Sequence, residues 1–337
     1  MTVQPKTALM IAVALSFGIL AGCQRTEPTP PPKSAKAKGI PNESYYFIGI
    51  STSVMYWIDA RMGFEDRGQQ LGVRAVFTGP ADWDPAGQAR QLDEIISKKP
   101  AGIVLAPADA GALKPGIDRA VDAGIHVVTV DTDSPESKRY CYIGTENYNA
   151  GVVVGDLLAQ ALGGQGKVGI CRLVGQWNIE ERTRGVRDAL KRHPGIEIVG
   201  EADDKANPAQ APTAVSALLS AHPEITGMAG LDAVSGGGIA RAVHAAGKKG
   251  QIKIVCFDRD EDMLQYIEDG TIEASVAQKT YLMSWLALTL LHSLAHDEIM
   301  HLPDWRAANA PPMPRSIDTG VMIITKENYR QFKHDRK

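Results

Sequence analysis

Two aspartates that each end an apolar run are the residues of this sequence best placed to do chemistry. In "HVVTVDTDSP", Asp131 and Asp133 follow a short apolar or β-branched run, and "KIVCFDRDE" repeats the Asp-x-Asp arrangement from Asp258. Charged groups near a core are costly unless something pairs with them. Since ligands of open parallel α/β sheets bind outside the carboxyl ends of the strands, Asp131 and Asp258 are predicted to accept hydrogen bonds from a ligand.

Aromatic and cationic side chains near two other predicted strand ends complete the candidate site. Tyr56 and Trp57 follow the strand-ending Ser51, and flat aromatic faces pack well on the C–H faces of sugar rings. Either ring could instead pack on the sheet. In "WNIEERTRGVRDAL", Arg182 offers a planar fork of donors, while Arg184 points to another face of the helix.

No sequence motif points to catalysis, and we predict no cofactor and no metal. A G-x-S-x-G elbow and a P-loop are absent from the sequence. The glycines of "GGQG" at 163–166 join a predicted helix to a strand, which suits a helix C-cap rather than the phosphate-binding turn of a Rossmann fingerprint. "LLHSLAHDEIMH" places His292 and His296 four residues apart with His301 beyond, a spacing that can bind zinc when a third ligand is aligned. Because no Glu stands beside the first histidine as in metalloproteases, we expect a solvated helix end instead.

The first residues of the chain predict export and anchoring. An apolar run over 8–20 is too short to span a bilayer but suits a signal peptide, and it leads to "LAGC" at Cys23. This pattern resembles the lipobox of bacterial lipoproteins, which implies cleavage after a signal peptide of residues 1–22 and lipidation of Cys23. An ordinary signal peptide or a short anchor is the alternative. Residues 23–43 are rich in Pro and Lys and are predicted to be a flexible tether.

The remaining cysteines are Cys141, Cys171 and Cys256, each inside an apolar strand-like run. We predict buried thiols, which behave as small hydrophobes. An odd number allows at most one bridge among them, and that alternative stays open.

Composition is that of an ordinary soluble globular protein, with 44% hydrophobic and 22% charged residues. The net charge of −3 and the absence of a basic stripe exclude nucleic acid as a partner. From Tyr45 onward, short apolar runs alternate with helix-length segments, a pattern typical of parallel sheets covered on both faces. Strands are predicted at 46–51, 74–79, 102–107, 126–131, 141–145, 167–174, 197–203, 227–232, 252–258 and 273–278.

The segment 133–140 joins two predicted strands without room for a helix, and we interpret it as a crossing between two doubly wound halves. The fold class is therefore α/β, with two parallel-sheet lobes. The N-terminal lobe is expected to comprise 44–136 plus 279–310, and the C-terminal lobe 137–278 plus 311–330.

From about Tyr45 to Lys326 the chain resembles the type I periplasmic sugar-binding proteins, the family of the ribose-binding protein. The matching pieces are "YW", "VDTDSPESKRYCYIGTENYNAG", "ERTRG", "LLSAHPEITG", "IVCFDRDEDMLQYIEDGTIEASVAQ" and "SIDTGVMIIT". The resemblance implies two lobes joined by a hinge. It also implies that Tyr56 and Trp57 stack on the ligand, that Arg182 donates to it, and that Gln278 is a hinge residue that touches it.

Three positions depart from the family pattern. Val54-Met55 stand where the family has Asn-Pro, and Thr132 replaces the arginine of ribose binders, although it is still expected at the site. Asp232 is our candidate for a family asparagine, with Ser235 as the other possible register. These changes favour a neutral, less densely hydrogen-bonded ligand than ribose, such as a hexose, a deoxy-sugar or a cyclic polyol.

The resemblance implies a solute-binding lipoprotein of the cell envelope, anchored by lipid on the periplasmic face. It would capture a monosaccharide or polyol between its lobes and deliver it to the permease of an ABC importer. We expect a monomer. The alternative is a sensory receptor of the same fold that signals to a membrane kinase.

Overall fold

The computed structural model describes residues 43–53, 56–300 and 305–333, all within one compact unit that spans residues 38–337. The predicted signal peptide, Cys23, nearly all of the tether, Val54-Met55 and His301 lie outside the described residues. Within the described ranges, no helix is both long and apolar enough to cross a membrane.

The first sheet has six parallel strands in the order β11-β5-β4-β3-β1-β2. Its strands are β1 (Ser44–Ile48), β2 (Arg74–Thr78), β3 (Gly102–Leu105), β4 (His126–Val130), β5 (Tyr142–Gly144) and β11 (Ser316–Asp318). Its helices are α1 (Trp57–Leu71), α2 (Pro85–Ser97), α3 (Ala110–Asp122) and α9 (Thr280–Ala295).

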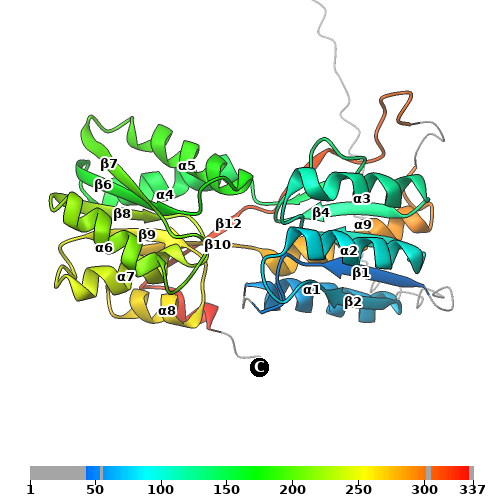
Figure 1. Ribbon diagram of the computed structural model, residues 1–337, viewed down its shortest axis with the longest axis horizontal. Helices are drawn as coiled ribbons and strands as arrows, with labels where there is room; N and C mark the ends of the chain where they lie inside the picture. The colour runs from blue at the N-terminus through cyan, green and yellow to red at the C-terminus, as the bar shows by residue number, and fades with distance from the viewer. Residues whose placement is uncertain (1–42, 54–55, 301–304, 334–337) are drawn as a thin grey trace, which may run out of the picture. The chain divides into compact units, whose positions relative to one another are not determined.

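Helices cover both faces of this sheet (Figure 1). Tyr45 and Phe47 of β1 pack in a core with α1 and α9, whereas Tyr46 and Ile48 pack with α2 and α3 on the other face. Because successive side chains of a strand point to opposite faces, a strand between two helical layers must be apolar throughout. The continuous apolar runs of the sequence predicted this arrangement.

The second sheet has the order β12-β10-β9-β8-β6-β7, in which only β12 runs antiparallel to its neighbour. Its strands are β6 (Gln165–Arg172), β7 (Gly195–Asp203), β8 (Ile225–Gly230), β9 (Lys253–Phe257), β10 (Ala274–Gln278) and β12 (Val321–Thr325). Helices α4 (Asn147–Ala161) and α5 (Trp177–Leu190) share one core, and α6 (Ala211–Ala221), α7 (Ser235–Ala245) and α8 (Glu261–Glu268) share another. A short 3₁₀ helix, η1 (Tyr329–Phe332), follows β12.

The chain passes between the sheets later than the sequence predicted. β5 pairs with β4, and β11 pairs with β5, so both strands extend the first sheet. The lobe boundaries expected at 136 and 310 are therefore wrong. The first crossing follows Gly144, the second follows Gln278, and the third lies in the short turn between β11 and β12.

Segment 133–140 was predicted to cross between the two halves, but it is hydrogen-bonded within the first lobe. Asp133 accepts hydrogen bonds from the guanidinium of Arg139 and from the hydroxyl of Thr129, all largely buried. The second aspartate of "DTD" is thus paired within its own lobe. Cys141, Cys171 and Cys256 are buried free thiols, as predicted.

Candidate functional site

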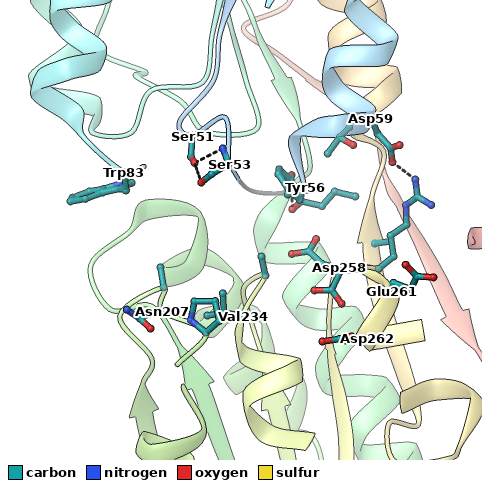
Figure 2. A pocket seen from close by; sticks show the side chains of 18 of the residues that line it. Ser51, Ser53, Tyr56, Asp59, Trp83, Asn207, Val234, Asp258, Glu261 and Asp262 are labelled. Carbon is teal, nitrogen blue, oxygen red and sulfur yellow. Dashed lines mark hydrogen bonds and ion pairs between the residues drawn. The ribbon is translucent and has the colours of Figure 1, made fainter. Parts of the chain in front are cut away.

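A pocket with a cavity volume of about 800 Å³ lies between the carboxyl edges of the two sheets. The first lobe lines it with the loops after β1 and β2, and the second lobe with the segments after β7, β8 and β9 (Figure 2). Four of the predicted site residues line it, namely Ser51, Tyr56, Asp258 and Gln278. This is the strand edge at which parallel α/β sheets bind ligands.

The two strand-ending aspartates share an unusual backbone conformation. Asp131 follows β4 with φ of 63°, and Asp258 follows β9 with φ of 74°. Asp and Asn enter this left-handed region more readily than other residues with a side chain. In each sheet the chain therefore turns sharply at the point where the carboxylate is presented.

Asp131 belongs to a hydrogen-bonded chain that joins both lobes. Its Oδ1 accepts from the Tyr56 hydroxyl at 2.5 Å and from Gln278 Nε2 at 3.3 Å. Arg182 Nη2 donates to Gln278 Oε1 at 2.7 Å. Burial raises the pKa of Asp131, while the Tyr56 hydroxyl and the Arg182 charge oppose that rise. Four residues that the sequence predicted at the site are thus brought together.

Arg182 stands behind the pocket lining rather than in it. Its Nε donates to Asn147 Oδ1 and its Nη1 to the Leu231 carbonyl, both at 2.9 Å, and its guanidinium lies 4.1 Å from the ring centroid of Phe257. Three of its five N–H groups therefore point at protein acceptors. Its donation to a ligand remains a prediction.

The carboxylate of Asp258 differs because no donor within the described ranges is hydrogen-bonded to it. The residue is 9% exposed, and Figure 2 shows Tyr56 and Asp258 on facing sides of the pocket. Burial raises the pKa of Asp258 to about 7, with Arg182 opposing the rise and Asp131 adding to it. A buried carboxylate that lacks donors costs free energy, which ligand hydroxyl groups would recover.

Trp57 packs on the sheet, which is the alternative that the sequence left open for either ring. It is only 6% exposed and packs edge-on against Phe47 in the core of the first lobe, with ring centroids 6.0 Å apart. It is not among the residues that line the pocket, and its stacking on a ligand stays a prediction. Of the adjacent aromatic pair, only Tyr56 faces the pocket.

Thr132 and Asp232 are likewise engaged elsewhere. The Thr132 hydroxyl donates to the Pro107 carbonyl at 2.9 Å. Asp232 accepts from the backbone N–H of Leu173, Val234 and Ser235, at 2.7, 3.0 and 3.1 Å, and so holds the start of α7. Neither side chain is among the residues that line the pocket, and the contact of either with a ligand stays a prediction.

Trp83 is a pocket residue that the sequence analysis missed. It is 61% exposed and lies on the loop after β2. Asp84 follows it and caps α2 by accepting from the Gly87 N–H at 2.8 Å, with Pro85 at the first helical position. The available signal was this Asp-Pro helix start, which marks the tryptophan as a loop residue at a strand-to-helix turn.

Acidic side chains dominate the charge of the pocket lining. The lining carboxylates are Asp59, Asp82, Asp258, Asp260, Glu261 and Asp262. Arg259 also lines the pocket, but it is ion-paired with Asp59 of the other lobe (Figure 2). A phosphate or carboxylate ligand would be repelled, so this lining disfavours an anionic ligand.

Comparisons with known proteins agree with this geometry. Residues 45–298 match the family described as periplasmic binding protein domain. The chain is 24% identical over 300 residues to the ribose import binding protein RbsB of Bacillus subtilis, covering 88% of this chain and 94% of that protein. A sugar-binding protein of a sugar ABC transporter from Bacillus halodurans superposes with a TM-score of 0.82 at 34% identity, covering 86% of this chain and all of the other. The protein in a structure described as the XylFII-LytSN complex superposes with a TM-score of 0.75 at 26% identity, covering 85% of this chain and 98% of that one.

Proposed function

This chain belongs to the periplasmic binding protein family, and we propose that it captures a neutral monosaccharide or a related polyol in the pocket between its two sheets. Members of this family are extracytoplasmic binding proteins and not enzymes. The observation that carries the proposal is the pair of strand-ending carboxylates, one from each lobe. Asp258 lines the pocket, and Asp131 is hydrogen-bonded to Tyr56 and Gln278, which also line it.

The chemistry of the lining supports a polyhydroxylated, uncharged ligand. Asp258 and Gln278 offer acceptors for hydroxyl groups, and Tyr56 and Trp83 offer aromatic surface for the C–H faces of a ring. The acidic lining disfavours anions. The sugar named for the Bacillus subtilis relative supports the same ligand class.

Calorimetry and thermal shift with a panel of uncharged sugars test the proposal. The panel contains glucose, galactose, xylose, ribose, fucose and inositol, with ribose 5-phosphate as the anionic control. A ligand that binds only the folded state raises the melting temperature. We expect one or a few uncharged members to bind with 1:1 stoichiometry, and the phosphate ester to fail. Tight binding of the phosphate ester alone would overturn the proposal.

We further propose that the protein is a monomer, anchored through lipid on Cys23, that hands its ligand to the permease of an ABC importer. The family and the Bacillus halodurans relative support the transport role. The sequence pattern that ends at Cys23 supports the anchor. Cys23→Ser should abolish lipid labelling and release the protein from membranes, whereas unchanged membrane fractionation would refute the anchor.

A second candidate is a sensor that passes its bound signal to a membrane kinase, favoured by the likeness to the protein in the XylFII-LytSN complex. Deleting the gene separates the roles. Loss of ligand uptake, with intact ligand-induced transcription, supports transport, and the reverse supports sensing.

A further inference from the structure

A cluster of potential metal ligands lies in the first lobe, remote from the pocket. Glu43 immediately precedes β1, at the amino edge of the sheet, while the pocket lies at the carboxyl edge. His292 and His296 lie in the last turn and at the end of α9. One ligand atom from each of the three residues falls within 4.8 Å of the others.

His292 is not the solvated residue that the sequence predicted. It is 4% exposed, and its Nε2 has no hydrogen-bond partner among the described residues. A buried polar atom left unpaired costs free energy and is rare in folded proteins. The imidazoles of His292 and His296 are stacked, with centroids 4.1 Å apart and planes at 25°. The one-turn spacing therefore brings both rings to the same place.

The third member supplies a buried carboxylate. The Glu43 side chain is 4% exposed, and both of its oxygens lie 3.1 Å from His296 Nε2. The hydroxyl of the fully buried Tyr45 donates to Glu43 Oε1. Over the described ranges, no lysine or arginine forms a salt bridge with Glu43. A buried carboxylate beside neutral imidazoles lacks a compensating full charge.

We propose that Glu43, His292 and His296 bind one divalent transition-metal ion of the zinc type. Two imidazole nitrogens and one carboxylate oxygen form a ligand set that zinc uses, with a fourth position left for water. His296 is 23% exposed, so water can reach the ligand set on its side. The ion would give the unpaired Nε2 of His292 its partner and would neutralise Glu43.

The geometry requires the side chains to adjust. Ligand atoms on a tetrahedral zinc ion stand about 3.3 Å apart, so the atoms that are farthest apart, within 4.8 Å, must approach by up to about 1.5 Å. The stacked imidazoles must also turn, because each ring binds a metal in its own plane. The hydrogen bond from Tyr45 orients the Glu43 carboxylate, as outer partners of metal ligands commonly do. The competing interpretation is a plain pair of His296 with Glu43, which leaves His292 Nε2 unused. The ion would join the start of β1 to the end of α9 and so stabilise the first lobe.

Zinc titration of chelator-treated, full-length protein tests the site. Calorimetry is expected to show one zinc ion per chain, and zinc is expected to raise the melting temperature. Glu43→Gln, His292→Gln and His296→Gln should each weaken zinc binding at least tenfold and remove the thermal shift. His222→Gln is the matched control, because His222 also pairs with a glutamate, Glu224, but lies in the second lobe. That variant should bind zinc as the unmodified chain does.

Cobalt provides a second signature. Co²⁺ bound to the unmodified protein should give visible d–d absorption, which His296→Gln should lose even if the more buried His292→Gln variant fails to fold. The proposal is overturned if the protein binds no zinc at 100 μM, or if all three site variants bind zinc with unchanged affinity. Neither result bears on sugar binding, because the two sites share no residue.

Discussion

At the scale of single residues, the aspartates differ in the hydrogen-bond donors around them. Asp133 has the guanidinium of Arg139, and Asp232 has three backbone N–H groups. Asp131 has Tyr56 and Gln278. Asp258 has none among the described residues, and a ligand can satisfy it without displacing a protein group.

Ligand affinity should therefore fall as the pH falls below about 7. Burial raises the pKa of Asp258 to about 7, and hydroxyl donors bind the ionised form better. Below this pKa a ligand must first drive off a proton, which weakens binding by up to about tenfold per pH unit. Calorimetry at pH 8, 7, 6 and 5 measures the slope. Asp258→Asn should flatten it, and an equally steep slope in that variant would assign the effect to another group.

The raised pKa of Asp258 also makes the stability of the ligand-free protein depend on pH, but in the opposite direction to ligand affinity. Because the folded pKa of Asp258 lies above the ordinary value of 3.8, the contribution of this group to stability is fully present below pH 3.8 and is lost as the pH rises through about 7. Asp258→Asn should remove this pH dependence of stability, because asparagine stays neutral at every pH. Asparagine suits the backbone because it also tolerates a φ of 74°.

Replacing Asp232 should affect stability and leave ligand binding intact. Asp232→Ala removes the acceptor of three backbone N–H groups near α7, which should lower the free energy of unfolding by about 1 to 2 kcal/mol. Urea denaturation measures this loss. The dissociation constant of the ligand should change less than twofold, and a tenfold change would return Asp232 to the binding site.

At the scale of the elements, the loops after the strands decide which residues reach the pocket. The turn from β2 to α2 is fixed by Asp84 and Pro85, and it leaves Trp83 exposed at the pocket. Helix α1 begins at Trp57, and its buried face turns that ring toward Phe47. The aromatic surface of the first lobe is therefore Tyr56 and Trp83.

Trp83→Ala should weaken ligand binding about tenfold while leaving the melting temperature unchanged. An exposed ring contributes little to the core, but it would lose the burial that a sugar ring gives it. Trp305→Ala is the control, because Trp305 contacts Tyr140 away from the pocket. Equal affinity in the Trp83 variant would limit the aromatic contact to Tyr56.

Much of this element layout could be predicted from the sequence. All ten predicted strands exist, since a strand buried on both faces must be a continuous apolar run. The crossing at 133–140 was misplaced because β5 has only three residues, and its pairing with β4 decides its lobe. Sequence alone could not show that Trp57 faces inward while Tyr56 faces the pocket. Only tertiary packing decides which of two adjacent aromatic residues at a helix start faces the core.

At the scale of the whole described unit, Gln278 connects the parts of the site. It ends β10, where the chain leaves the second sheet, and it contacts Asp131 and Thr145 of the first lobe and Arg182 of the second. The sequence offered one glutamine at the end of an apolar strand, and its role depends on contacts with residues up to 222 positions away. Long-range convergence of this kind cannot be obtained from local pattern.

The most direct test of the account is calorimetry of the sugar that binds best, with Asp131→Asn and Asp258→Asn measured beside the unmodified protein. Both variants keep the left-handed backbone conformation, and Asp131→Asn retains an acceptor for Tyr56. We predict that each substitution weakens binding at least tenfold, about 1.4 kcal/mol, with little change in melting temperature. Unchanged affinity in both variants, or a large fall in melting temperature with affinity preserved, would contradict a ligand held between carboxylates of the two lobes.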